Sequence, residues 1–363
     1  DNHAAAVHLD QWLTTEVLPN HTEEQVAYRK NQRYVARLMR AQSKPDKPLP
    51  IDPESSYLLS GCLGGLGLTV AQWLVEQGAR HLILLSRQGA NTPEKQTAIA
   101  QLRSLGCQVV LPRVDVNNAT ALQTTLSQLS ESQLPESCPA IRGVIHAAGI
   151  DGGLHPLESL TQSTLRQTLA PKVRGSWNLH QLSLGWELDF FVNFSSIAAV
   201  WGSANQAHYG AANEFQNLLS HYRHHQGLPS LTVNLSAIAD TGLLSQADAS
   251  QVKRLSEIGI TPLSLPQMTA ALEQLLRTSV QQCVVAAVDW PQFNAVYQAG
   301  RHRSLLKPLV ETESLAAESP VQTDWIAHIL ALPAVDQLAR LRHTLQQEVA
   351  DVLGLSSTAL PDP

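Results

Sequence analysis

Residues 57–67 read Tyr-Leu-Leu-Ser-Gly-Cys-Leu-Gly-Gly-Leu-Gly, an apolar run that leads directly into a glycine-rich turn. The stretch that follows places Val70, Trp73 and Leu74 at the spacing of one helix face, continuing from Leu66. A short apolar run, a glycine turn and an amphipathic stretch predict a buried strand followed by a helix that packs against it. The main domain is therefore expected to begin near Tyr57.

Six further apolar runs follow at helix-length intervals. They begin at His81, Gln108, Gly143, Phe190, Leu231 and Cys283. Strands that are buried on both faces read as nearly continuous apolar runs, and crossover helices between such strands keep them parallel. The seven runs together predict an α/β fold, a doubly wound parallel sheet.

The remaining chain divides into smaller segments. Residues 24–39 contain two strand-like runs around a polar turn, which predicts a β-hairpin. Residues 44–56 are rich in Pro, Lys, Asp and Ser, and residues 301–335 in Thr, Glu, Ser and Pro, so both are expected to be linkers. Apolar residues recur at helical spacing from Leu338 onward, which predicts a last amphipathic helix within residues 336–363.

Composition excludes several classes of protein. The 363 residues are 44% apolar and carry a net charge of -6 with no Lys/Arg run, which argues against a nucleic-acid partner. No apolar run approaches the roughly 20 residues that span a bilayer, so we expect a cytoplasmic protein without a membrane partner. The four cysteines lack metal or disulfide spacing, and we expect no metal site.

The glycine turn carries the features of a pyrophosphate site. The residues that form it are Gly61, Gly64, Gly65, Leu66 and Gly67. Glycines let the backbone approach phosphate groups, which accept hydrogen bonds from the free amides at the positive end of the helix. A tight turn that binds no ligand is the alternative interpretation of the same glycines.

The second strand ends at Ser86 and Arg87, where a site selective for NAD would usually place an Asp or Glu. A guanidinium instead matches the 2′-phosphate of NADPH, although a solvated arginine at a strand end is the alternative. The ends of the third and fourth strands supply further candidate cofactor contacts. They are Asp115 and Val116, placed for the adenine, and His146, Ala147, Ala148 and Gly149, a turn of mostly small residues.

Ser196 ends the fifth strand, and Tyr209 opens the next helix after a stretch rich in Gly, Ser and Asn. Both are expected at the carboxyl edge of the sheet, where open α/β sheets bind ligands. Reduction of a carbonyl builds negative charge on its oxygen, so it needs a proton donor and a second hydrogen bond aimed at that oxygen. We assign the first role to Tyr209 and the second to Ser196.

A tyrosine that donates a proton near neutral pH needs a nearby cation to favour the phenolate. The general short-chain dehydrogenase pattern places a lysine four residues after the tyrosine, but Asn213 occupies that position here. Lys172, 24 residues before Ser196, is the candidate instead. This exchange of the Lys and Asn positions is diagnostic of one branch of that superfamily.

The chain resembles the ketoreductase domains of modular type I polyketide synthases, within the short-chain dehydrogenase/reductase superfamily with its Rossmann-like sheet. The motifs that carry the resemblance are Gly-Gly-Leu-Gly, Leu-Leu-Ser-Arg, His-Ala-Ala-Gly, Ala-Pro-Lys-Val, Phe-Ser-Ser and Tyr-x-x-x-Asn. The resemblance implies a catalytic tetrad of Lys172, Ser196, Tyr209 and Asn213. It also implies NADPH-dependent reduction of a β-ketoacyl thioester on an acyl carrier protein to the β-hydroxyacyl thioester, within a larger synthase whose other domains are partners.

The resemblance also assigns the segments. Residues 1–43 are similar to the end of the family's noncatalytic structural subdomain, and residues 57–300 to the catalytic domain. Residues 336–363 are similar to the start of a carrier protein, truncated before its phosphopantetheine site. Residues 150–154, Ile-Asp-Gly-Gly-Leu, lack the Leu-Asp-Asp associated with B-type products. Asn193 occupies the place of the tryptophan associated with A-type products, so the resemblance leaves the stereochemistry undecided, with a slight lean to the A type.

Three alternatives are open to the sequence. A noncatalytic reductase-like scaffold of the synthase would be expected to have lost tetrad members, yet all four are present. A stand-alone oxidoreductase would not need the hairpin or the carrier-like tail. A pure docking module would fail to bind any dinucleotide, and the glycine turn with Arg87 argues against it.

Overall fold

The computed structural model describes residues 23–30, 32–41, 44–131, 138–239, 249–300 and 303–316, with five positions between 332 and 340. The chain divides into two compact units, Asp1–Leu309 and Val310–Pro363. The sheet, the hairpin and the candidate site described below all belong to the first unit.

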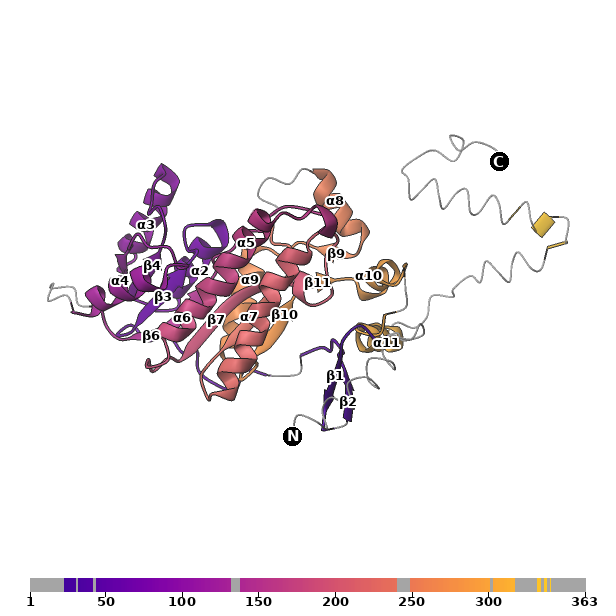
Figure 1. Ribbon diagram of the computed structural model, residues 1–363, viewed down its shortest axis with the longest axis horizontal. Helices are drawn as coiled ribbons and strands as arrows, with labels where there is room; N and C mark the ends of the chain where they lie inside the picture. Colours follow the sequence, from indigo (N-terminus) through magenta and orange to yellow (C-terminus); the bar gives the residue numbers. More distant parts are fainter. Residues whose placement is uncertain are drawn as a thin grey trace. The chain divides into compact units, whose positions relative to one another are not determined.

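The first unit is built on a seven-stranded parallel sheet (Figure 1). Its strands, in spatial order, are β10 (Gln282–Val285), β8 (Leu231–Leu235), β7 (Phe190–Ser196), β6 (Ile141–His146), β3 (Ser56–Ser60), β4 (His81–Leu85) and β5 (Gln108–Val110). Every neighbouring pair is parallel. Each strand coincides with one of the seven apolar runs, so the prediction of a doubly wound α/β fold is confirmed.

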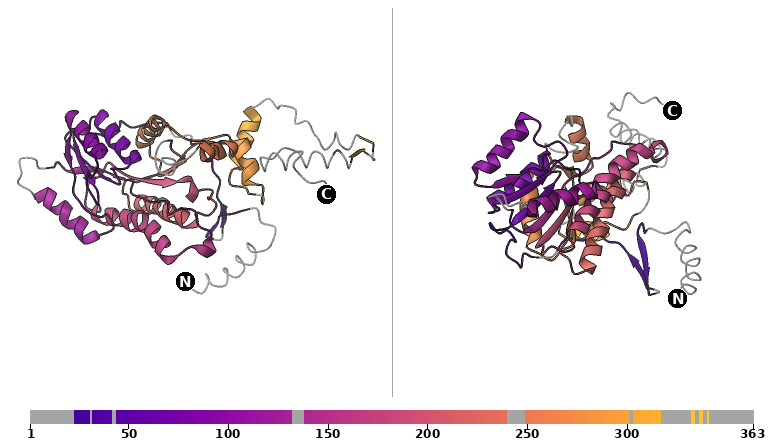
Figure 2. Two further views of the ribbon diagram at one scale, coloured as in Figure 1. Left: turned by 90° about the horizontal axis from the view of Figure 1, so that it is seen from above. Right: turned by 60° about the vertical axis from the view of Figure 1, so that its left-hand side comes forward.

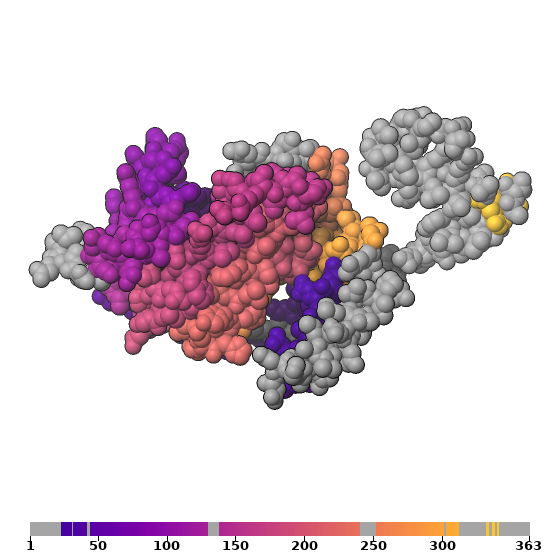
Figure 3. Space-filling model, viewed as in Figure 1, coloured from indigo at the N-terminus to yellow at the C-terminus, as the bar shows by residue number. Residues whose placement is uncertain are grey.

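Helices cover both faces of the sheet (Figures 1 and 2). On one face, α2 (Gly65–Glu76), α3 (Pro93–Ser104) and α9 (Leu265–Leu276) pack their buried side chains into one hydrophobic cluster. On the other face lie α4 (Ala119–Glu131), α5 (Gln162–Ala170), α6 (Ser176–Leu182) and α7 (Ala207–His225). In the space-filling view, α5, α6 and α7 form one continuous surface (Figure 3). These helices therefore bury both sides of the central strands, as the apolar runs require.

Shorter elements complete the described part of the chain. They are β1 (Val26–Arg29), β2 (Gln32–Val35), η1 (Leu157–Ser159), the π-helical turn η2 (Pro171–Gly175), η3 (Ile197–Ala199), α8 (Ala249–Glu257), β9 (Ile260–Thr261), β11 (Ala287–Val288), α10 (Trp290–Tyr297) and α11 (Lys307–Ala316). The strands β1 and β2 pair antiparallel as the expected hairpin. The backbone N–H of Leu38, just after the hairpin, donates to the carbonyl of Leu305 at 2.9 Å, which ties this segment to the end of the first unit.

One expectation for the flanking segments is wrong. Residues 301–335 were expected to form a linker, but α11 occupies Lys307–Ala316. Leu305, Leu306 and Leu309 are buried there, so a short apolar cluster outweighs the polar composition around it. The amphipathic helix expected within residues 336–363 lies almost wholly outside the described residues.

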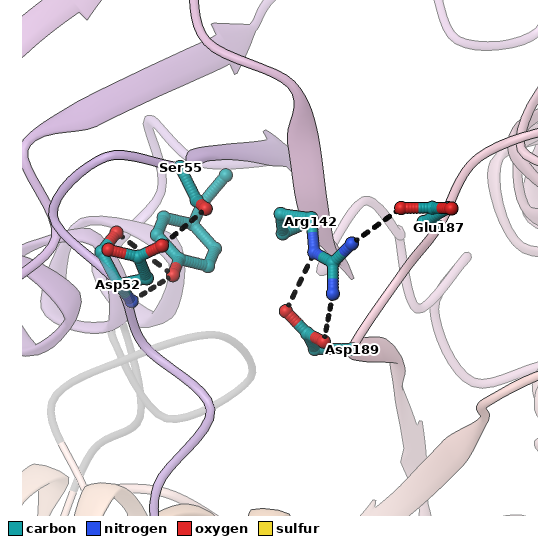
Figure 4. Close-up of polar contacts among 6 residues, drawn as sticks. Asp52, Ser55, Arg142, Glu187 and Asp189 are labelled. Atoms are coloured by element: carbon teal, nitrogen blue, oxygen red, sulfur yellow. Dashed lines mark hydrogen bonds and ion pairs between the residues drawn. The ribbon is translucent and has the colours of Figure 1, made fainter.

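The amino edge of the sheet is held by polar contacts (Figure 4). Arg142, in β6, donates to both carboxylate oxygens of Asp189, at 3.1 and 2.8 Å, and to Glu187 at 3.1 Å. Next to it, the Tyr57 hydroxyl accepts from the backbone N–H of Asp52 at 2.6 Å. The motif residues follow the opposite, carboxyl ends of the strands, so this edge serves packing and the other edge carries the candidate site. None of the helices described is both long and apolar enough to cross a membrane.

Candidate functional site

The glycine turn after β3 is shaped by close backbone packing. Gly61 has a φ of +71°, and a Cβ there would lie 2.4 Å from the backbone N of Ala148. A Cβ on Gly67 would lie 2.5 Å from the Cα of Cys62. The N-cap residue of α2, Gly64, has no side chain that could cap the helix, so its first amides are available to an anion. The turn therefore fits a pyrophosphate.

Two arginines, Arg87 and Arg113, follow the carboxyl ends of the neighbouring strands β4 and β5. Ser86 pairs with Arg113 in a parallel bridge, and Arg87 is exposed beside it. The Arg113 side chain packs against Gly89, since a Cβ there would lie 3.0 Å from the Arg113 Nε. Arg113 was not among the residues predicted from the sequence. Arg113 lies two residues before Asp115, after the neighbouring strand. That position could have identified it as a candidate cofactor contact.

The turn after β5 is fixed to the α6 side of the sheet. The Asp115 carboxylate accepts from the backbone N–H of Asn117 at 2.9 Å, which leaves its second oxygen for a ligand. Val116 is buried, and its carbonyl accepts from the Asn178 carboxamide at 2.8 Å. The two residues predicted to contact the adenine thus lie on a turn that is hydrogen-bonded to α6.

His146 connects three elements of the site. Its Nε2 lies 2.8 Å from the carbonyl of Pro171, which can only accept, so Nε2 carries the proton. Its Nδ1 then accepts from the Ser60 hydroxyl at 2.5 Å. Burial, together with the nearby charge of Lys172, lowers the pKa of His146 to about 3, so the ring is neutral. His146 therefore joins β3, β6 and η2 rather than exchanging protons. Ala147 continues the link, with its N–H donating to the Ser60 carbonyl at 2.9 Å.

Lys172 is delivered to the site by the π-helical turn η2, a geometry that is frequent at functional sites. Its Nζ donates to the carbonyl of Phe194 at 2.8 Å and to the Oε1 of Gln216 at 3.2 Å. Gly149 lets the side chain pass, since a Cβ there would lie 2.8 Å from the lysine Cε. Burial lowers the pKa of Lys172 to about 7, so the amine can gain or lose its charge near neutral pH.

Ser196, Tyr209 and Asn213 meet where β7 ends and α7 begins. The Ser196 hydroxyl accepts from the backbone N–H of Ala198 at 3.2 Å. The Lys172 Nζ lies 6.0 Å from the centre of the Tyr209 ring. Asn213 is fully buried and donates to the Tyr209 carbonyl at 2.7 Å, while its Oδ1 has no partner among the described residues. All four residues of the predicted tetrad therefore lie together at the carboxyl edge of the sheet.

The phenol of Tyr209 is adjusted by opposing influences. Burial raises its pKa because it disfavours the phenolate, and the negative charge of Asp151 acts in the same direction. Hydrogen bonding to Ser196 and Asn213 lowers the pKa of Tyr209 and offsets part of this rise. Burial, the largest of these influences, leaves the pKa of Tyr209 above its ordinary value.

Two polar residues at the site were not singled out from the sequence. Gln216 is fully buried beside Lys172, and the Ser195 hydroxyl donates to the carbonyl of Asn213 at 3.1 Å. Gln216 follows Tyr209 by seven residues and Asn213 by three, which places the three side chains on one face of α7. That spacing was the signal that could have identified it.

The comparison with known families decides the membership of this chain. A family model described as the KR domain matches residues 55–240, which span the sheet from β3 through β8 and all four tetrad positions. The chain belongs to the KR domain family. The resemblance to polyketide synthase ketoreductases is thereby confirmed, and this ketoreductase domain is an oxidoreductase that uses a nicotinamide cofactor.

Relatives of this ketoreductase domain are parts of very large synthases. Polyketide synthase GfsA of Streptomyces halstedii is 33% identical to this chain. The matched region covers 92% of this chain and 4% of GfsA. Highly reducing polyketide synthase sor1 of Hypocrea jecorina is 39% identical over 61% of the chain, and 9% of that protein is covered. The chain thus spans less than a tenth of the length of these relatives.

Solved structures agree with the family. A structure titled as an A1-type ketoreductase has a TM-score of 0.75 and 31% identity, covering 84% of this chain and 63% of that one. A second, titled as A-type ketoreductases from a modular polyketide synthase, has the same TM-score with 32% identity and the same coverage.

Proposed function

We propose that this chain reduces a β-ketoacyl thioester, carried on an acyl carrier protein, to the β-hydroxyacyl thioester with NADPH. The observation that carries the proposal is the convergence of Lys172, Ser196, Tyr209 and Asn213 at the carboxyl edge of the sheet. Family membership supports the reaction class, and the geometry supports the assignment of roles to individual side chains.

Each tetrad residue has its own role in the protonation of the carbonyl oxygen during reduction. When bound, the cofactor supplies the hydride that adds to the carbonyl carbon. Ser196 holds the carbonyl oxygen by a hydrogen bond, and Tyr209 gives that oxygen the phenolic proton as negative charge develops on it. The charge of Lys172 favours the resulting phenolate, and the unpartnered Oδ1 of Asn213 is available to the proton relay that restores the phenol.

Binding of NADPH is supported by the charge and shape of the site. Residues 61–67 and the first amides of α2 would hold the pyrophosphate, with Ala147, Ala148 and Gly149 alongside it. Asp115 and Val116 would contact the adenine. Arg87, with Ser86 beside it, would bind the 2′-phosphate, and the neighbouring Arg113 adds a second positive charge there. These features favour NADPH over NADH.

The carrier protein and the other domains of the synthase are the proposed partners. We retain residues 1–43 as the end of a structural subdomain and residues 336–363 as the start of a carrier protein. Residues 150–154, which lack Leu-Asp-Asp, together with the likeness to structures titled as A-type ketoreductases, support an A-type product.

The test is reduction of a short β-ketoacyl thioester, followed by the absorbance of the reduced nicotinamide. We expect NADPH to be oxidised much faster than NADH, and Tyr209→Phe to abolish the reaction. Tyr222→Phe is the matched control, because Tyr222 lies on the same helix but is exposed. Binding of NADPH without turnover under any condition, including added carrier protein, would favour the scaffold role over the reductase role.

A further inference from the structure

Gln216 is a buried side chain on α7 to which the proposed reaction gives no role. It is fully buried, and its Oε1 accepts a hydrogen bond from the Lys172 Nζ at 3.2 Å. We propose that Gln216 is a positioning residue for Lys172, whose amine it holds beneath Tyr209 and whose charged form it stabilises. This inference rests on the proposed function, because Tyr209 is taken as the proton donor and Lys172 as the cation that acidifies it.

Lys172 has few groups that could stabilise a positive charge. Among the described residues it has no carboxylate partner, and its acceptors are the Phe194 carbonyl and the Gln216 carboxamide. An ammonium group can only donate, so both interactions favour its protonated form. The Phe194 carbonyl belongs to the backbone of β7 and is fixed by the fold. Gln216 is therefore the side chain whose identity adjusts the charge of Lys172.

Other titratable groups near Lys172 do not replace this role. His146, from β6, is neutral, because burial and Lys172 itself lower its pKa to about 3. Tyr209, from α7, is protonated in its acid role, and Asp151 acts on the phenol rather than on the lysine. In the described part of the chain, Gln216 is thus the side chain that accepts a hydrogen bond from the Lys172 amine.

Gln216 is itself held firmly against the sheet. Its backbone carbonyl accepts from the Thr232 hydroxyl, in β8, at 2.9 Å. About one turn earlier on α7, the carbonyl of Asn213 accepts from the Ser195 hydroxyl, in β7. These bonds pin α7 to two neighbouring strands, so the carboxamide of Gln216 has little freedom to leave the lysine.

The experiment measures the pKa of Lys172 directly in the cofactor-free chain. Carbon-13 NMR of the lysine ε-carbons suits this, because the sequence holds seven lysines and Lys172→Met identifies the signal. Gln216→Met keeps the volume but removes the acceptor, and should lower the pKa of Lys172 by about one pH unit. Gln216→Glu keeps the shape but adds a negative charge, and should raise that pKa by at least about one unit.

Thr232→Val is the matched control. It changes the packing of Gln216 through the backbone carbonyl but does not contact Lys172, so the pKa of Lys172 should stay within about 0.3 units of its original value. Opposite shifts in the Met and Glu variants support the positioning role, because a general loosening of the core would move both in one direction. Unchanged values in both folded variants, or equal shifts in all three variants, overturn it.

The rate of reduction then separates this inference from the proposed function. The loss of activity at high pH should move with the pKa of Lys172, to lower pH in Gln216→Met and to higher pH in Gln216→Glu. If the NMR shifts occur but the activity profile does not follow them, the coupling between Gln216 and Lys172 stands and the catalytic role of the lysine fails. If the NMR shifts are absent while Tyr209→Phe is inactive, the reductase stands and the role of Gln216 fails.

Discussion

Two buried cations lie on the α7 side of the sheet, and burial affects their pKa values to different extents. Lys172 lies near the start of α7, and Arg223 lies in its last turn. Neither forms a salt bridge among the described residues. Burial lowers the pKa of Lys172 to about 7 but that of Arg223 only to about 10. At neutral pH the lysine is therefore poised to titrate, whereas the arginine stays charged.

The surroundings of the two groups explain what each can do. The Arg223 guanidinium lies 4.0 Å from the centre of the Phe191 ring and donates to His180, Ser183 and the carbonyl of Pro229, at 3.0 to 3.1 Å. A delocalised cation with several fixed donors binds its neighbours together. Lys172 has two hydrogen-bond acceptors and a tyrosine ring nearby, and its amine can gain or lose a proton near neutral pH. Arg223 thus holds parts of the fold together, whereas Lys172 has the role that we propose for it in the reaction.

Removal of the lysine should cause the largest change. Lys172→Met takes away the charge that favours the Tyr209 phenolate, and we expect the kcat for reduction to fall by about 100-fold or more. The chain should remain folded, because methionine fills a similar volume. Steady-state kinetics with NADPH and a β-ketoacyl thioester measures the effect, and Lys253→Met, at an exposed lysine, is the control. A variant that keeps more than about a tenth of the activity would remove Lys172 from the mechanism.

Removal of the arginine should affect stability instead. Arg223→Met leaves the His180 Nδ1 and the carbonyl of Pro229 without their donor, and we expect a loss of roughly 3 kcal/mol in the free energy of unfolding. Activity per folded molecule should be unchanged, because Arg223 lies about 21 Å along α7 from Tyr209.

Chemical denaturation of both variants measures this difference, and Arg142→Met provides the control. Arg142 also makes three hydrogen bonds, but it is a partly exposed side chain at the amino edge of the sheet (Figure 4). Its loss should cost much less than that of Arg223, because solvent screens the interactions of a partly exposed side chain. If the Arg142 and Arg223 variants lose the same free energy of unfolding, burial does not make Arg223 more important for stability than Arg142.

The sequence predicted the sheet and the tetrad but not these neighbours, for physical reasons. Strands buried on both faces must be apolar, and glycine turns and tetrad spacings are local patterns. Gln216 and Arg223 are polar residues on an amphipathic helix, where a buried and a solvated side chain look alike until the helix is docked. The π-helical turn at Pro171–Gly175, which buries Lys172, has no local sequence pattern of its own from which it could be predicted. The α11 helix lies within an expected linker, because the polar composition of that segment gives no sign that three leucines at and just before the helix start are buried.

The titration of Lys172 should make stability depend on pH. Its pKa is about 7 in the folded chain, below the ordinary value of 10.5, so between these values the unfolded state binds a proton that the folded state lacks. Stability should therefore rise with pH across this window, by up to about 1.4 kcal/mol per pH unit relative to Lys172→Met. Urea denaturation of both chains at several pH values measures the slope. Parallel curves would mean that Lys172 keeps an ordinary pKa in the folded chain.

The smallest effect should come from turning the second cation into a copy of the first. Arg223→Lys keeps a positive charge but gives up the planar fork that reaches His180 and Ser183, and we expect a loss of about 1 kcal/mol at neutral pH. A buried ammonium also loses its proton more easily than a guanidinium, so this variant should gain stability relative to the parent chain as the pH rises. Denaturation at neutral and alkaline pH measures both the loss of stability and its change with pH, and Arg142→Lys is the control for a partly exposed site. If the deficit of Arg223→Lys is the same at both pH values, its lysine stays charged, and the difference between the two buried cations lies in their surroundings rather than in the chemistry of lysine and arginine.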